Sequence, residues 1–266
     1  MKKFQIGGKK MIELIIAVIF MLLFSYYDIF NNRIIPDEVT YSFLFVGAMM
    51  FFAFLPFELM KIVIAVIVFI IGYILYKIGY LGGADVYAIT GLTLLLPLNF
   101  MGIPTIIVIL LGSMLLTMFY VILNFFVKSK EIKFEKQDMI TAGLWVIGYS
   151  ALAYMIYNIG QTTIGITVFF LGLLNSLFAL IKTNLINSMI EQIPLDKIID
   201  EDILAIDKMD QEFVKENKIE RLLTENEINK LKDLGVEEVP VYTGLPPYLP
   251  FVSIVTIILI LFQLLY

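Results

Sequence analysis

Long apolar segments recur along this chain of 266 residues, and they restrict its fold more than any other feature. The hydrocarbon core of a bilayer is about 30 Å thick, and a helix of about 20 apolar residues crosses it. Seven runs come near that length, at 11–27, 39–55, 59–76, 103–127, 142–157, 164–181 and 248–266. A shorter run, 86–98, crosses only if the membrane is locally thinner or if neighbouring residues join the helix. The sequence therefore predicts an all-α, polytopic transmembrane protein with six to eight spans.

Acidic residues are concentrated between residues 183 and 245, where 15 Asp or Glu accompany 7 Lys or Arg. This segment has a formal charge of −8, whereas the rest of the chain, with 9 acids and 12 bases, has +3. The sequence thus predicts a transmembrane domain over 1–182, a small acidic extramembrane domain over 183–245 and a C-terminal transmembrane helix over 246–266. The acidity either keeps the domain soluble or attracts a basic segment of a substrate.

One helix is well marked inside the acidic domain. Thr224 and Glu227 have the spacing of a capping box, and Gly235 is a typical stop. Apolar residues between them recur at helical spacing, which predicts that this helix packs one face against the rest of the domain.

The loop near residues 128–138 predicts the orientation of the chain in the membrane. It contains four lysines, and loops rich in Lys and Arg lie in the cytoplasm. Counting spans back from this loop places Asp28 and Asp85 in the cytoplasm, and counting forward places the acidic domain there too. The lysines of the N-terminal segment then lie outside, against the rule, unless translation begins at Met11. Omitting the short span 86–98 would invert the relation between the lysine loop and the two aspartates.

Histidine and cysteine are both absent, which excludes several kinds of catalytic site. The chain has no disulfide, no thiolate nucleophile, no Ser-His-Asp triad and no histidine-ligated zinc or haem. Acid–base chemistry near neutral pH must therefore use carboxylates, lysines or tyrosines with shifted pKa values. This directs attention to the few charged residues at the edges of the spans, which are costly in a membrane.

Asp28 and Asp85 are the two most informative of these residues. Asp28 follows the first apolar run and precedes a polar turn. It either ends a helix in water beside Arg33 or has a functional role. Asp85 follows Gly82, Gly83 and Ala84, and the two glycines allow a sharp bend before the next helix. Its alternative role is an ordinary N-cap of that helix. Two crossings separate the aspartates, so both lie on the same side of the membrane.

A pair of neighbouring carboxylates can share one proton, because both do not ionise easily together. One then acts as a base toward water while the other donates to a substrate carbonyl, which is the chemistry of an aspartic peptidase. It requires no metal and no cofactor, and we predict neither.

These residues resemble the GXGD-type membrane aspartic peptidases, and especially the archaeal preflagellin and type IV prepilin peptidases. The resemblance rests on Asp28 with the following segment 33–37, on Gly82-Gly83-Ala84-Asp85, and on the acidic domain with the Gly/Pro-rich segment 244–251 before the last span. It implies that Asp28 and Asp85 are catalytic, that Gly82, Gly83 and Ala84 form a motif with a hinge or close-approach role, and that no metal is bound. It also implies an enzyme in the cell membrane that cuts short basic leaders from flagellin-like or pilin-like precursors at the cytoplasmic side.

The resemblance has departures. Ala84 replaces the second glycine of the motif, and the two runs between 142 and 181 exceed the six spans of the preflagellin enzymes. Nothing corresponds to the N-terminal cysteine-bearing domain of bacterial relatives, so no N-methyltransferase activity is implied.

The partners that the resemblance implies are the leader-bearing precursors and the lipid bilayer, and no nucleic acid is expected. The alternatives are a proton-coupled transporter, a non-catalytic scaffold and a presenilin-like protease, which needs both aspartates deeper in the bilayer.

Overall fold

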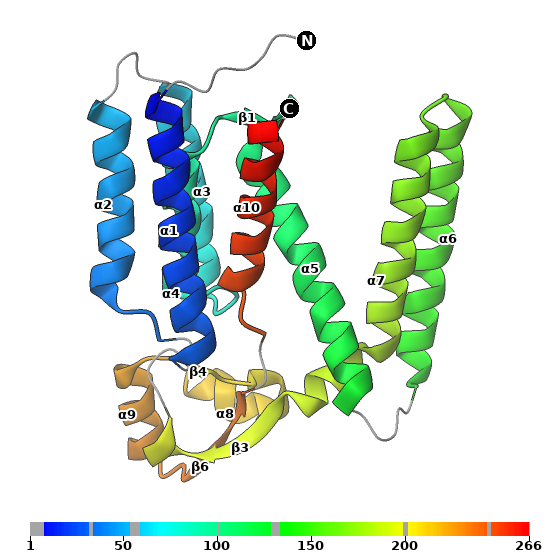
Figure 1. Cartoon of the computed structure of the whole chain (residues 1–266). Coiled ribbons are helices and arrows are strands. Elements are labelled where there is room, and N and C mark those ends of the chain that lie inside the picture. Colours follow the sequence, from blue (N-terminus) through cyan, green and yellow to red (C-terminus); the bar gives the residue numbers. More distant parts are fainter. Residues whose placement is uncertain are drawn as a thin grey trace. The chain divides into compact units, whose positions relative to one another are not determined.

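The computed structural model describes residues 8–31, 34–53, 59–100, 102–128, 134–198, 202–243 and 246–265. Each of the eight predicted apolar runs forms a helix over most of its described residues (Figure 1). The helices are α1 (Gly8–Phe30), α2 (Asp37–Ala53), α3 (Leu59–Lys77), α4 (Gly83–Leu95), α5 (Thr105–Lys128), α6 (Lys136–Asn158), α7 (Thr162–Ser188) and α10 (Leu249–Leu265). Helices suit these sequences because a helix satisfies its backbone polar groups internally, as hydrocarbon surroundings require.

Length and composition agree with a membrane protein. Among the described residues, five helices are long and apolar enough to cross a bilayer: Lys10–Phe30, Leu59–Lys77, Thr105–Val127, Lys136–Asn158 and Ile164–Ser188. Two further apolar helices, α4 and α10, are shorter. The predicted all-α, polytopic architecture is therefore confirmed.

The chain divides into two compact units. The first consists of Met1–Thr117, Pro194–Val239 and Pro246–Tyr266, and the second of Met118–Ile193 and Pro240–Leu245. The first unit contains both aspartates and is the one that matters for the site.

In the first unit, α4 is the central helix. Its 13 residues give a length of about 20 Å at 1.5 Å per residue, so it is shorter than the hydrocarbon core. Eight of these residues are buried, on all sides of the helix, because α1, α2 and α3 pack against it. The chain then turns through a hairpin of β1 (Asn99–Phe100) and β2 (Ile103–Pro104) into α5. The short length of α4 is tolerated because protein rather than lipid surrounds this helix.

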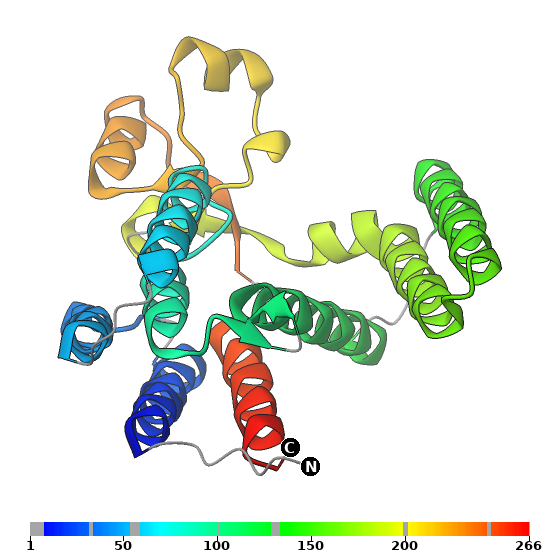
Figure 2. The same cartoon turned by 90° about the horizontal axis from the view of Figure 1, so that it is seen from above.

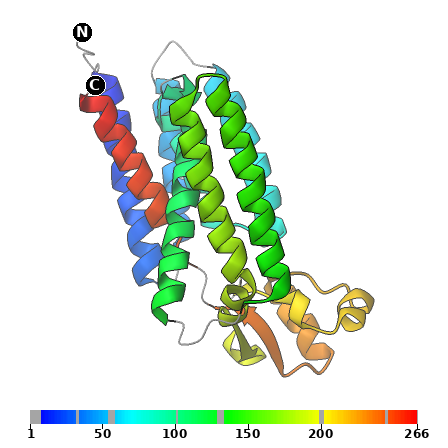
Figure 3. The same cartoon turned by 90° about the vertical axis from the view of Figure 1, so that its right-hand side faces the viewer.

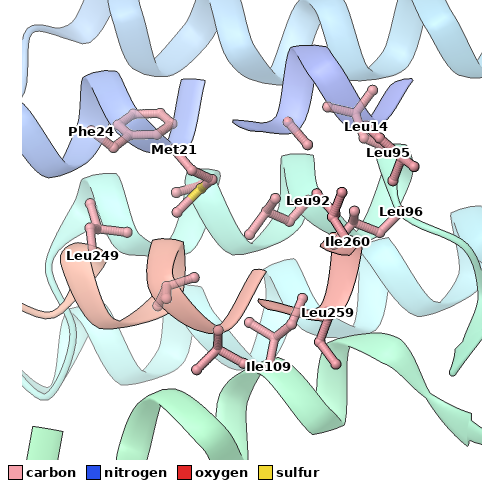
Figure 4. Packing of buried hydrophobic residues seen from close by; sticks show 14 of the residues in the cluster. Leu14, Met21, Phe24, Leu92, Leu95, Leu96, Ile109, Leu249, Leu259 and Ile260 are labelled. Atoms are coloured by element: carbon pink, nitrogen blue, oxygen red, sulfur yellow. The ribbon is translucent and has the colours of Figure 1, made fainter. Parts of the chain in front are cut away.

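The core of the first unit joins α1, α4, α10 and the first half of α5. Figure 4 shows side chains from all four helices meeting, among them Met21, Phe24, Leu92, Ile109 and Leu249. In the view of Figure 2, α10 lies between α1 and the beginning of α5. The last helix of the chain is therefore packed against the first one.

Glycine permits close packing between α2 and α4. A Cβ atom built on Gly91 would lie 2.6 Å from the ring of Phe43, and one built on Gly47 would lie 3.4 Å from the carbonyl oxygen of Gly91. Small residues let the backbones of membrane helices approach closely, and this adds dispersion contacts that lipid cannot replace. Phe43 is fully buried against this glycine.

The segment Pro194–Val239 of the first unit contains η1 (Leu195–Lys197), β4 (Asp202–Ile203), η2 (Ile206–Lys208), α8 (Gln211–Glu216), β5 (Leu222–Leu223) and α9 (Glu225–Asp233). Strands β4 and β5 pair antiparallel, and Leu204, Leu223 and Leu231 are fully buried. The apolar residues of this segment are thus sufficient to form a local core.

The predicted helix after Thr224 is confirmed as α9. The Thr224 hydroxyl accepts a 3.4 Å hydrogen bond from the backbone N–H of Glu227, and the helix ends before Gly235, whose φ is +75°. The carboxylate of Glu227 instead accepts from the backbone of Glu220, at 3.0 Å, and from Lys230, at 3.2 Å. Only the threonine half of the predicted capping box therefore has its expected partner.

The second unit consists mainly of the antiparallel pair α6 and α7, which lie side by side in Figure 3. Gly172 faces the side chain of Tyr149, and the Ser176 hydroxyl donates to the carbonyl of Ala142 at 2.8 Å. The second half of α5 packs on α7 through Ile122, Phe125 and Ile181. Strands β3 (Ile190–Pro194) and β6 (Glu238–Tyr242) are hydrogen-bonded to each other.

Candidate active site

Asp28 lies in the last turn of α1 and is buried, with 8% of its surface exposed. This corrects the alternative in which it caps a helix in open water. A carboxylate at the C-terminal end of a helix is on the unfavourable side of the helix dipole, so it needs compensation from elsewhere. The backbone N–H of Leu249, the first residue of α10, supplies it by donating a 3.0 Å hydrogen bond to Asp28 Oδ2.

Asp85 lies in the first turn of α4 and is partly exposed. The N-cap of this helix is Gly82, not Asp85, and the Gly82 N–H donates a 3.1 Å hydrogen bond to Asp85 Oδ2. A carboxylate near the N-terminus of a helix is favoured by the dipole. The two aspartates therefore lie at different kinds of helix end, Asp28 at a C-terminus and Asp85 at an N-terminus.

The glycines of the motif have different surroundings. A Cβ on Gly82 would lie 3.3 Å from Asp85 Oδ2, and the Gly82 φ of −72° is open to any residue. Glycine at position 82 therefore leaves room for the Asp85 carboxylate, and no unusual backbone angle requires a glycine there. Gly83 and Ala84 are the first two residues of α4. Arg33, which the sequence places near Asp28, lies outside the described residues.

Tyr248 and Leu249 lie at the start of α10, and sequence reasoning gave neither of them a role at the site. The Leu249 N–H donates to Asp28. The Tyr248 hydroxyl also shares a 2.9 Å hydrogen bond with Ser113 of α5. The only signal in the sequence was the run of prolines and glycine before the last span.

A polar seam between α1 and α10 fixes this arrangement. The hydroxyls of Ser25 and Ser253 are 2.6 Å apart, and Ser253 also reaches the carbonyl of Met21 at 2.8 Å. Met21, Ser25 and Asp28 share one face of α1 because their spacing follows the helical period. The seam thus leads along α1 to Asp28.

Arg221, just before β5, contacts the loop that leads to Asp85. The Arg221 guanidinium lies over the ring of Tyr80, 4.8 Å from its centroid, and a Cβ on Gly79 would contact the Arg221 side chain at 3.4 Å. Gly79 has a φ of +71°, in the left-handed region that glycine adopts without strain. The loop entering α4 is therefore held from outside the helical core.

Comparison with known proteins identifies one family. Residues 15–122 match the model of the type IV leader peptidase family, a segment of less than half of the chain that contains both Asp28 and Asp85. No curated protein and no solved structure matches the sequence. The matched segment runs from α1 into α5, whereas α6, α7, the acidic segment and α10 lie beyond it. The predicted resemblance is confirmed over this segment, which is similar to the type IV leader peptidase family.

Proposed function

We propose that this chain is a membrane aspartic endopeptidase of the GXGD type, with Asp28 and Asp85 as its catalytic pair. Its substrates are leader-bearing precursors of archaeal flagellins or type IV pilin-like proteins, from which it removes a short basic leader at the cytoplasmic side of the membrane. The family match supports a leader peptidase, and the finer assignments are our proposal.

One observation carries this proposal. The end of α1, which carries Asp28, and the start of α4, which carries Asp85, lie at the same end of the first unit (Figure 1), and Asp28 accepts a hydrogen bond from the start of α10. Asp28 is buried and Asp85 is partly exposed, so the two have different surroundings. Such a difference favours distinct protonation states, which is what an acid–base pair requires.

The reaction follows from these two groups. The ionised carboxylate removes a proton from a water molecule, and the water oxygen attacks the carbonyl carbon of the scissile peptide. The protonated carboxyl donates its proton to the carbonyl oxygen, giving a neutral tetrahedral diol. Proton transfer to the amide nitrogen then lets the C–N bond break, and the two carboxyl groups end with one proton between them, as they began.

The acidic segment supports recognition of a basic leader. Its acids at 212, 216, 220 and 225 are all exposed. Charges of one sign raise the local concentration of an oppositely charged ligand. We therefore assign the acidic domain, with proposed bounds 183–245, to attraction of the leader, and the bounds 1–182 and 246–266 to the membrane domain and its last helix.

The test is a cleavage assay in membranes with a panel of leader-bearing flagellin and pilin-like precursors. Wild type should release a leader from at least one precursor, and Asp28→Asn and Asp85→Asn should each abolish release at normal protein levels. Glu38→Gln is a matched control, because Glu38 is an exposed acid in the first turn of α2. Cleavage that survives either aspartate change would refute the pair, and a wild type that cleaves none of the precursors would favour the transporter or scaffold.

A further inference from the structure

We propose that the start of α10 is a positioning element of the active site, in which the backbone N–H of Leu249 orients Asp28 and the hydroxyl of Tyr248 anchors this helix start to α5. This inference rests on the proposed function, because it assigns a role toward one of the same two aspartates. Both residues lie beyond the segment 15–122 that matches the family.

In the first turn of α10, the N–H of Leu249 donates to Asp28, whereas the N–H groups that follow donate within the helix start. Helices leave their first N–H groups without partners inside the helix. In α10, the N–H groups of Phe251 and Val252 both donate to the carbonyl of Tyr248, at 3.1 and 3.3 Å, and Pro250 has no N–H. The N–H of Leu249 remains, and it donates to Asp28 at 3.0 Å.

The position of α10 along α1 is fixed by independent contacts. Ser253 lies one turn after Leu249 and bonds to Ser25 and to the carbonyl of Met21, one and two turns before Asp28. Leu249 is 1% exposed and Ser253 is 3% exposed, so water does not compete for these bonds. A sliding movement of α10 would break the seam and the bond to Asp28 together.

Tyr248 anchors the same element to α5. Ser113 is fully buried in α5 and holds the Tyr248 hydroxyl at 2.9 Å. Two consecutive residues of one helix start thus bond to α1 and to α5, and these bonds fix the place of the Leu249 N–H beside Asp28.

The first test compares Leu249→Pro with Leu249→Ala. Both remove the leucine side chain, but only proline removes the N–H, and proline is tolerated in the first position of a helix. A hydrogen bond to a charged group predicts a kcat for Leu249→Pro about ten- to hundredfold below that of Leu249→Ala, with KM nearly unchanged. The acid limb of the pH profile should move to higher pH only in the proline variant, because a carboxylate that loses a donor binds its proton more readily.

The second test uses Tyr248→Phe, which deletes one hydroxyl. We expect kcat to fall and the pH profile to change, whereas the control Tyr154→Phe, at a tyrosine 67% exposed on α6, should match wild type. Ser113→Ala should reproduce part of the Tyr248→Phe effect, since it removes the hydrogen-bond partner of the Tyr248 hydroxyl. A Tyr248→Phe enzyme with the wild-type kcat and pH profile would overturn the role of Tyr248.

A stability cycle separates this inference from the proposed function. Melting temperatures of Leu249→Pro and Leu249→Ala are measured with Asp28 present and with Asp28→Asn, and no cleavage is needed. The proline variant should melt about 2–4 °C below the alanine variant with Asp28. The gap should shrink in the Asp28→Asn background, because an amide oxygen accepts a hydrogen bond more weakly than a carboxylate does. An equal gap in both backgrounds would overturn the bond, whereas absence of precursor cleavage would count against the proposed function alone.

Discussion

The backbone N–H of Leu249 donates a 3.0 Å hydrogen bond to the carboxylate of Asp28, although 221 residues separate them in the sequence. The bond joins the C-terminal end of α1 to the N-terminal end of α10, so the negative end of one helix dipole and the positive end of another meet at one carboxylate. A buried acid at a helix C-terminus is thereby stabilised. The last helix of the chain becomes part of the environment of Asp28.

Gly82→Ala should reduce cleavage without unfolding the protein. The new methyl group would lie 3.3 Å from Asp85 Oδ2, which forces the carboxylate to shift by a few tenths of an ångström. Small misplacements of a reacting group lower rates strongly, so we expect a loss of about tenfold in kcat/KM. Gly143→Ala in α6 is the control, because it meets nothing within 4 Å. Equal activity of the two variants would show that space beside Asp85 is not limiting.

Ser253→Ala should weaken the contact between α1 and α10. A cycle with Ser25→Ala and the double variant should give a coupling free energy of about 0.6 kcal/mol, and at most about 1.7 kcal/mol, as is usual between membrane helices. Thr256→Val is the contrast in the same helix, because the Thr256 hydroxyl is buried and has no hydrogen-bond partner among the described residues. We expect that change to be neutral or stabilising. Reversible unfolding in detergent measures both, and additive effects of the serine changes would contradict the contact.

Gly91→Ala should destabilise the protein through overpacking. Its Cβ would lie 2.6 Å from the buried ring of Phe43, which has no room to move away. Overpacking of this kind costs about 1–3 kcal/mol. Gly148→Ala, in the open middle of α6, should instead stabilise by about 0.5–1 kcal/mol through backbone entropy. Thermal unfolding distinguishes the two, and the same sign for both would refute the close packing of α2 on α4.

Arg221→Ala should loosen the loop that enters α4. The guanidinium stacks over Tyr80 at 4.8 Å, and a contact of this kind contributes about 0.5–1 kcal/mol at an exposed site. Amide hydrogen exchange of residues 78–84 should therefore become faster by about threefold. Tyr80→Phe keeps the ring and should leave exchange near the wild-type rate, whereas Tyr80→Ala should resemble Arg221→Ala. Unchanged exchange in both alanine variants would mean that the contact does not hold the loop.

Because the chain has no cysteine, single cysteines can report the orientation of α4. Asn99→Cys in β1 and Asp207→Cys in η2 are both at exposed positions of the first unit. We expect an impermeant maleimide to label residue 99 in intact cells and residue 207 only after permeabilisation, because α4 separates Asp85 from β1 and the acidic segment is assigned to the cytoplasm. Labelling of both from outside would refute that assignment.

The helices could be predicted from the sequence, because hydrophobic runs of membrane length have few alternative structures. Asp28 and Asp85 could also be singled out, since acids at span edges are rare in a chain so apolar. The predicted capping box correctly located α9. These signals are all local, and they depend only on a residue and its near neighbours.

The contacts between distant parts could not be predicted. Asp28 was expected beyond the first span, but α1 continues to Phe30, and the start of α10 donates a hydrogen bond to the Asp28 carboxylate. The end of a helix depends on such tertiary contacts, which a run of apolar residues does not encode. The hydrogen bond between Tyr248 and Ser113 could not be predicted for the same reason, since a tyrosine at a membrane edge is ordinary by itself.

The most direct test of the catalytic pair is kcat/KM for leader cleavage by the wild type, Asp28→Asn, Asp85→Asn and the double variant. Groups that act as one unit are not additive, so each single change should remove about a thousandfold or more, and the double change should lose no more than the worse single. A single variant that retains most of its activity, or losses that multiply in the double variant, would contradict a shared role for Asp28 and Asp85.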